Sequence, residues 1–281
     1  MSESTQHLLA LLAYPGLLST VILTLLVVLI AQLSAPGGGL TRGIMSTLAG
    51  DGSALLLVAA LAPAAAAALL PWPGSPLAGA WRLDRLWLVW AILELSYGLA
   101  LLPGLQSPSP ASMRAAMREA QLSAAGRVVF WVAIGVTVWA GDWTWQSLPA
   151  HVLALLAATL ALPSAAGWGP FAPERSIAPG GPEGDLSRAA AELAQWGRAV
   201  RTTVVTTLVP VLALPHIPAT HWGFNLALVV VVTLILATIG RVMNGNSVRR
   251  PTLDGLRWCY TRALPLALLA GVAVVLGNRW L

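Results

Sequence analysis

A series of apolar stretches, each about as long as a bilayer is thick, limits how this chain can fold. A helix needs roughly 20 mostly apolar residues to cross a membrane. We predict spans at about 12–33, 53–72, 86–104, 127–143, 147–164, 202–218, 223–243 and 262–278. Several contain internal Gly or Pro, which bundled membrane helices tolerate. The predicted fold is an all-α integral membrane protein with about eight transmembrane helices, forming a single polytopic membrane domain over residues 1–281.

The composition excludes a water-soluble globule and offers little catalytic chemistry. Only 10% of the 281 residues are charged and the mean hydropathy is +0.75, whereas a soluble domain carries about 25% charged residues. The single cysteine, Cys259, cannot form an internal disulfide or a cysteine metal cluster. The sequence has no Gly-rich nucleotide loop and no defensible catalytic triad. We therefore expect no catalytic residue, no metal site and no cofactor bound by this chain itself.

The basic residues predict the orientation of the spans. All 16 are arginines, and 13 of them fall in or beside the loops that follow odd-numbered spans. The positive-inside rule then places both termini outside. It also assigns four cytoplasmic loops, at about 34–52, 105–126, 165–201 and 244–261, of which the third, between helices 5 and 6, is the largest. The arginines are not concentrated on one element, so we predict the lipid bilayer, and no nucleic acid, as a partner.

Glu94 is the one carboxylate well inside a predicted span. A charge at the bilayer centre costs at least about 2.5–3.5 kcal/mol on insertion scales, so such a residue is a functional candidate. Glu94 could be a proton relay, or a neutral hydrogen-bonded residue in helix packing. For Arg127, at the start of the fourth span, the sequence favours an interfacial side chain over a buried partner of Glu94. His151 is predicted to be structural or interfacial.

Two cytoplasmic segments have helical amphipathic patterns. One covers 111–125 and carries Arg114, Arg118 and Glu119. The other follows a Gly- and Pro-rich stretch and runs from about residue 186 to 198, with Asp185 or Ser187 as a helix cap. Such helices lie in the membrane interface or dock a partner protein, and both interpretations remain open.

Four segments resemble the H-type membrane subunit family of NADH-quinone oxidoreductase (complex I) and its relatives in membrane-bound nickel–iron hydrogenases and formate hydrogenlyase. The most specific is Gly169-Pro-Phe-Ala-Pro-Glu174, followed by Gly181-Pro-Glu-Gly-Asp-Leu-Ser187, which is similar to the family's long cytoplasmic loop. The others are Leu12–Leu18, Ser107–Gln121 and Arg249–Leu269. The chain departs from the family at Ala172, where the family has an aspartate, and at Arg175-Ser176, where another glutamate is expected.

The resemblance implies a function and a set of site residues. The chain would be a membrane-anchoring, ion-translocating subunit of a respiratory oxidoreductase in a bacterial or archaeal cytoplasmic (inner) membrane. It would contact other membrane subunits and a soluble Fe–S redox arm, with quinone at the level of the whole complex. The proton-relay candidates are Glu94, Glu119 and Glu174. The candidates for docking the peripheral arm are Arg114, Arg118, Phe171, Glu174, Arg175 and Asp185.

A stand-alone multi-spanning transporter of a small solute is the alternative from another class. Inverted repeats with interrupted helices would support it, and the two halves of the sequence show no convincing repeat. A third interpretation is an anchor or assembly factor that conducts nothing. Co-purifying redox subunits would separate these interpretations.

Overall fold

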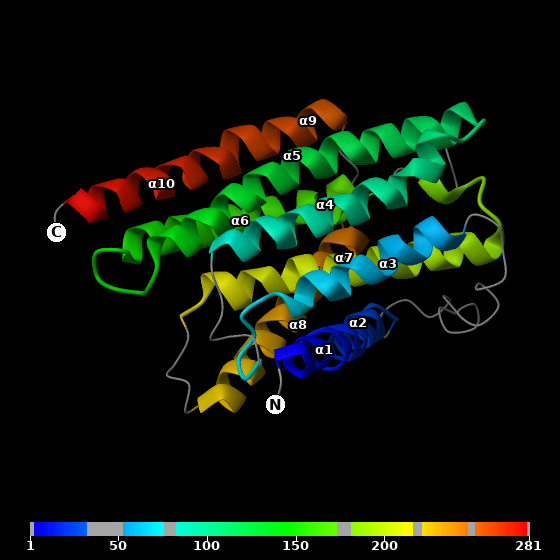
Figure 1. Cartoon of the computed structure of the whole chain (residues 1–281). Helices are drawn as coiled ribbons and strands as arrows, with labels where there is room; N and C mark the ends of the chain where they lie inside the picture. The colour runs from blue at the N-terminus through cyan, green and yellow to red at the C-terminus, as the bar shows by residue number, and fades with distance from the viewer. Residues whose placement is uncertain are drawn as a thin grey trace. The chain divides into compact units, whose positions relative to one another are not determined.

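A computed structural model describes residues 3–32, 53–75, 83–172, 181–215, 221–246 and 251–279. Every regular element in these ranges is helical (Figure 1). The longer helices are α1 (Glu3–Leu12), α2 (Leu17–Gln32), α3 (Ser53–Ala68), α4 (Leu83–Leu105), α5 (Pro110–Ala140), α6 (Leu148–Ala166), α7 (Arg188–Ala213), α8 (Trp222–Asn246), α9 (Thr252–Trp258) and α10 (Leu264–Arg279). Short turns are η3 (Gly169–Phe171), η4 (Gly181–Glu183) and the π turn η6 (Cys259–Ala263).

The fold-class prediction is confirmed: the chain is an all-α integral membrane protein, and the eight predicted spans fall largely on helices. Six segments are long and apolar enough to cross a bilayer. They are Thr5–Leu29, Arg85–Leu105, Pro110–Ala140, Leu148–Phe171, Trp222–Asn244 and Thr252–Gly277. The second predicted span corresponds to α3, which has 16 residues. The sixth corresponds to α7, whose 26 residues include Arg198 and Arg201.

Two predicted cytoplasmic segments are helical extensions of spans. The predicted cytoplasmic segment at 105–126 is helical from Pro110 onward, as the amphipathic pattern at 111–125 predicts, and this helix continues without a break into the next span, because α5 runs for 31 residues. At 1.5 Å per residue α5 is about 46 Å long, longer than the roughly 30 Å hydrocarbon core. Likewise, the amphipathic stretch from residue 186 continues into α7. In both cases an amphipathic segment runs directly into an apolar one without a helix-ending residue between them.

The ends of the chain also differ from the prediction. The first predicted span corresponds to α2, which begins at Leu17, and a separate helix, α1, precedes it and ends at Leu12. The last begins ten residues earlier than expected, at Thr252, so most of the predicted loop at 244–261 is helical. The predicted loop at 34–52 lies entirely outside the described residues.

The chain divides into two compact units. The first unit is made of residues 1–70, 75–120 and 173–204, and the second of 71–74, 121–172 and 205–281. In the first unit, α3 and α4 lie side by side (Figure 1). Ser96 of α4 donates a hydrogen bond of 2.6 Å to the carbonyl of Ala59 in α3. Gly197 of α7 packs close to Ala60, where an added Cβ would lie 3.1 Å from the alanine methyl carbon.

Small residues build the second unit. The buried side of the α9–η6–α10 segment has small residues at nearly every turn, and it packs against α6. These are Gly255, Cys259, Ala263, Ala267 and Ala270. A π turn takes more residues per turn than an α turn, so η6 keeps this four-residue spacing on one side of the segment. Small residues let membrane helices approach closely, which strengthens their van der Waals packing.

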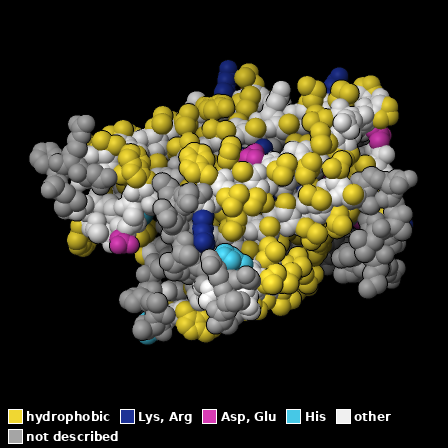
Figure 2. Space-filling model, viewed as in Figure 1, with side chains coloured by type: hydrophobic (Ala, Val, Ile, Leu, Met, Phe, Trp, Pro, Cys, Tyr) yellow, Lys and Arg dark blue, Asp and Glu magenta, His cyan; other side chains and the backbone are white. Residues whose placement is uncertain are grey.

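The outward surface is apolar. Large hydrophobic side chains of α2, α8 and α10 are half exposed, among them Ile22, Ile235 and Leu268. Figure 2 shows hydrophobic side chains over most of the face in view, with few charged groups among them. Such a surface needs lipid or other apolar partners around it, as expected of a membrane protein.

Candidate functional site

A buried network of charges in the first unit is the strongest candidate site. The Arg198 guanidinium on α7 contacts two carboxylates, those of Glu119 on α5 and Glu183 in η4. Its Nη1 donates to Glu119 and its Nη2 to Glu183. The side chains of Glu119 and Glu183 are only 10% and 8% exposed. One arginine therefore joins three elements through two charge-assisted hydrogen bonds.

Local backbone features position this network. Ser187 caps α7, its hydroxyl accepting a hydrogen bond of 3.3 Å from the backbone N–H of Ala190. Gly104 of α4 leaves room for η4, because a Cβ there would lie 2.8 Å from the carbonyl oxygen of Pro182. Ser107 also donates to the Asp185 carboxylate. The turn that carries Glu183 is thus held against the end of α4.

A second buried arginine lies one turn further along α7. Arg201 is 3% exposed, and its guanidinium carbon is 5.3 Å from the centroid of the Tyr97 ring on α4. This distance is typical of a cation–π interaction. Nε and Nη1 of Arg201 are buried and form no hydrogen bond with the described residues. The formal charges of the two arginines and of the two carboxylates, Glu119 and Glu183, therefore cancel within one region of the first unit.

The electrostatics of this network favour the charged form of Arg198. Burial alone lowers the pKa of Arg198, but the charges and hydrogen bonds of Glu119 and Glu183 outweigh it, and the net pKa is raised. Arg198 therefore stays cationic at any working pH. A buried charge is tolerated only when it is paired and hydrogen-bonded, and Arg198 meets that condition through its two carboxylates.

The structure brings only one of the relay candidates into this network. Glu119 is a member of it. Glu94 is half-buried on α4, one helical turn before Tyr97, and makes its own contacts. Glu174, together with the docking candidate Arg175, lies outside the described residues.

The remaining docking candidates are divided between the two units. Arg114 is exposed and Arg118 is half-buried on the first turns of α5. Asp185 is exposed and bonded to Ser107. Phe171 belongs to the second unit, where it is 3% exposed and its ring lies 6.5 Å from that of Trp258. Burial makes Phe171 a packing residue in the described structure.

Sequence reasoning missed the roles of Glu183, Arg198 and Arg201. The sequence indicates only that Arg198 and Arg201 lie on the cytoplasmic side and that Glu183 belongs to a loop motif. One signal was available, since Arg198 and Arg201 are three residues apart and so lie on the same face of a helix. Their partners could not be identified, because Glu119 is 79 residues from Arg198.

Two further polar residues are buried in the second unit. Arg127 is 7% exposed, which contradicts the predicted interfacial side chain. The reason is that Arg127 shares the buried side of α5 with Phe130 and Ile134, which follow it by three and seven residues. His151 is 1% exposed and stacks on Trp143, with ring centroids 4.5 Å apart and planes 10° apart. This contact supports a structural role for His151.

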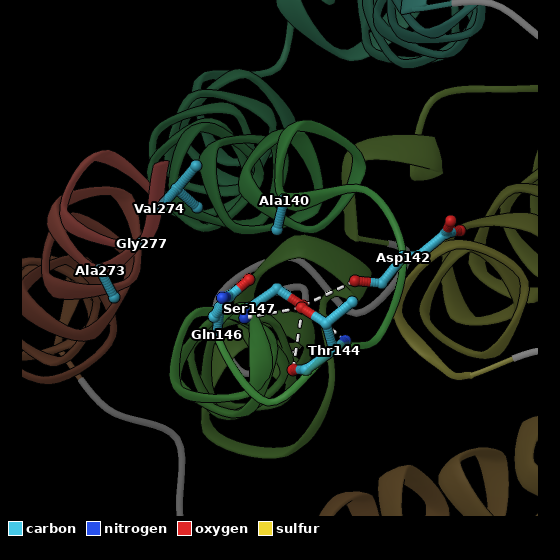
Figure 3. A pocket seen from close by; sticks show the side chains of 8 residues that line it. All are labelled: Ala140, Asp142, Thr144, Gln146, Ser147, Ala273, Val274 and Gly277. Atoms are coloured by element: carbon cyan, nitrogen blue, oxygen red, sulfur yellow. Dashed lines mark hydrogen bonds between the residues drawn. The ribbon is translucent and has the colours of Figure 1, made fainter. Parts of the chain in front are cut away.

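A small cavity at one end of the second unit offers less chemistry. Its volume is about 210 Å³, and its lining includes Ala140, Thr144, Ser147 and Val274 (Figure 3). The Ser147 hydroxyl is already used, since it donates to the carbonyl of Asp142 at 2.6 Å. The Asp142 side chain points away from the other labelled residues. Across the described residues, no group of three or more His, Cys, Asp and Glu side chains could hold a metal ion.

Comparison with known proteins shows a likeness of fold to solved structures. No protein-family model matches the sequence, and no curated protein matches it. A chain of the membrane-bound sulfane sulfur reductase, an archaeal respiratory membrane complex, has a similar structure with a TM-score of 0.68. The match covers 96% of this chain and 99% of that chain at 17% identity. The two chains therefore share a fold over almost their full lengths.

Proposed function

We propose that this chain is a membrane subunit of a complex-I-like respiratory assembly, in which it anchors a peripheral redox module. The proposal rests mainly on the shared fold with one chain of an archaeal respiratory membrane complex, over 96% and 99% of the two chains. The four sequence segments that resemble the H-type membrane subunits of complex I support the same assignment. Within that family, both a quinone-reductase and a hydrogenase type of assembly fit the sequence.

The buried charge network supports a role beyond passive anchoring. Removing one partner of a buried ion pair typically destabilises a protein by about 3–5 kcal/mol, while an apolar replacement of the whole network is often neutral. The chain is 57% hydrophobic, yet it retains Arg198 and its two carboxylates at positions where apolar side chains would often be as stable. All three residues come from segments that the arginine distribution assigns to the cytoplasmic side, where a peripheral redox arm would dock.

The docking surface that we propose includes the exposed first turns of α5. Arg114 is exposed there beside two large apolar side chains, Met113 and Met117, which are 39% and 50% exposed. A surface patch that combines an arginine with methionine side chains is typical of a protein–protein interface. Arg118 and Asp185 remain candidates for the same contact, together with residues 174 and 175, which lie outside the described ranges.

Ion translocation is a secondary part of the proposal. Glu119 and Glu183 are buried carboxylates that share one arginine. Redox-linked movement of η4 or α7 that breaks a bond to Arg198 would free that carboxylate to carry a proton. Glu94 would extend the path along α4. Related subunits have a series of carboxylate side chains that includes an aspartate at the position of Ala172. Because this chain lacks that aspartate, proton coupling would depend more heavily on Glu119 and Glu183.

Affinity purification of the tagged chain in mild detergent, followed by mass spectrometry, tests the assignment. We expect stoichiometric membrane subunits together with a soluble Fe–S protein. The variant R114E should release the soluble module while the membrane subunits stay bound, and R257E on α9 is the charge-matched control. A chain that purifies alone would contradict the assignment and favour the small-solute transporter.

Coupling is tested on the assembled complex in sealed vesicles. We expect E119Q to slow redox-driven proton uptake while electron transfer continues, with E192Q as the control at the exposed Arg188–Glu192 pair. Proton uptake by E119Q at the wild-type rate would remove ion translocation through this residue from the proposal. The anchoring role would stand, because it depends on co-purification alone.

A further inference from the structure

The C-terminal helical segment α9–η6–α10 has an exposed stripe that is charged at one end and apolar along the rest. Arg257 and Arg262 lie at the charged end, and both are exposed. Beyond them, apolar side chains that are exposed or partly exposed recur every three or four residues, which places them on one side of a helix. These are Pro265, Leu268, Val272 and Leu276.

The charged end is organised around Trp258. The Arg262 guanidinium carbon lies 4.6 Å from the centroid of the Trp258 ring. The ring is fixed in turn, because its indole N–H donates a hydrogen bond of 3.1 Å to the carbonyl of Leu160 on α6. Arg262 is thus held at a defined position on the surface while its N–H groups remain open to a ligand.

The charge around these two arginines is positive. Among the described residues, no carboxylate forms an ion pair with Arg257 or Arg262. The acid nearest in sequence is Asp254, an exposed residue of the first turn of α9. The sequence adds Arg249 and Arg250 just before α9, so the net charge of this region is positive. An anion is therefore the expected ligand.

The length of the apolar stripe indicates which anion. From Pro265 to Leu276 the helix rises about 16 Å at 1.5 Å per residue, close to half of the roughly 30 Å hydrocarbon core. The stripe is thus long enough to line the acyl chains of one lipid. Arg262 is the first residue of the predicted span at 262–278 and Arg257 precedes it, which places both arginines at the depth of the lipid headgroups.

We propose that Arg257, Trp258 and Arg262 bind the phosphate of an anionic phospholipid whose acyl chains lie along the stripe from Pro265 to Leu276. Arginine donors match phosphate oxygens in pairs, and basic residues next to a membrane helix attract anionic lipids. The apolar stripe supplies the rest of the complementarity. The proposal does not depend on the assignment to a respiratory complex.

Native mass spectrometry of the purified full-length chain provides the test. The protein is titrated with phosphatidylglycerol and, separately, with phosphatidylcholine of the same acyl chains. We expect a clear preference for phosphatidylglycerol that falls about fivefold for each arginine removed. In R257Q/R262Q the two lipids should bind almost equally. The control R188Q removes one exposed arginine elsewhere, as a match to the single variants R257Q and R262Q, and should keep the preference.

Four results would overturn the proposal. The first is equal binding of both lipids by the wild-type chain, and the second is an unchanged preference in R257Q/R262Q. The third is displacement of the lipid by millimolar inorganic phosphate, which would indicate a site for free anions. The fourth is a photo-crosslinker at position 260 that captures another protein subunit in native membranes. If the double variant does not fold, the single variants R257Q and R262Q give the same comparison.

Discussion

The two compact units of this chain are stabilised in different ways. The first unit contains buried ionised side chains, with Arg198 joined to Glu119 and Glu183 and with Arg201 over Tyr97. The second is built mainly from small residues, with alanines of α6 against the small-residue side of the C-terminal segment. Without a hydrophobic driving force between helices in lipid, close packing alone can hold such a unit together. Buried charges are therefore a feature that packing does not require.

That difference indicates where the functional constraint lies. An ion-pair network must be complete to be tolerated, because an unmatched buried charge costs more than the pair contributes. A helix–helix interface made of small residues tolerates polar substitutions poorly, but it does not require charged side chains in pairs. The first unit is thus the part of the molecule in which stability depends on a complete set of buried charges, and our proposal assigns proton transfer to the same side chains.

The largest expected effect comes from removing the central cation of the first unit. R198Q leaves two buried carboxylates without their shared arginine and should destabilise the folded chain by about 3–5 kcal/mol. The thermal midpoint in detergent, followed by size-exclusion chromatography, measures this loss. The control R188Q breaks only an exposed pair, which is worth about 0.3–0.5 kcal/mol.

A triple variant sharpens the interpretation of R198Q. In R198Q/E119Q/E183Q the network is neutral, and most of the lost stability should return. If the triple variant is no more stable than R198Q, the carboxylates are not the reason for the loss. The distinction between a charged first unit and a packed second unit would then fail.

An intermediate effect is expected from filling a close helix contact in the second unit. A Cβ at Gly126 of α5 would lie 2.5 Å from the backbone nitrogen of Ala165 on α6. G126A should therefore force the helices apart and cost about 1–3 kcal/mol. G135A is the matched control on the same helix, because nothing lies within 4 Å of its added Cβ. Equal thermal midpoints for the two variants would contradict close packing as the main source of stability there.

The smallest effect compares one neutral hydrogen bond from each unit. Ser96 donates to Ala59 at 2.6 Å in the first unit, and Ser164 donates to Leu122 at 2.8 Å in the second. Both link neighbouring helices, so S96A and S164A should each cost about 1 kcal/mol. Thermal midpoints measured side by side provide the check. A much larger loss for one serine would show that the units differ in more than their charges.

Much of the fold was predictable from local sequence properties. Each span is recognisable by itself, since roughly 20 apolar residues must be covered by lipid or by other helices wherever they lie. The helix ends were less predictable. Residues 111–125 and 186–198 have amphipathic patterns typical of separate surface helices, yet both continue into spans as parts of α5 and α7. An amphipathic pattern indicates which side of a helix is polar, but it does not indicate the residue at which the helix ends.

Hydropathy alone makes this chain a helical membrane protein, because hydropathy is a property of each segment wherever it packs. Which of the few charges form a site depends instead on how the helices come together. Glu119 and Arg198 are separated by 79 residues and meet only because the first part of α5, η4 and the first part of α7 pack in one unit. Trp258 and Arg262 differ in kind, since their four-residue spacing brings them together within one helical segment and only the anchoring of Trp258 on α6 required the fold. Contacts within a helix can be inferred from spacing, whereas contacts between helices depend on packing that no local pattern encodes.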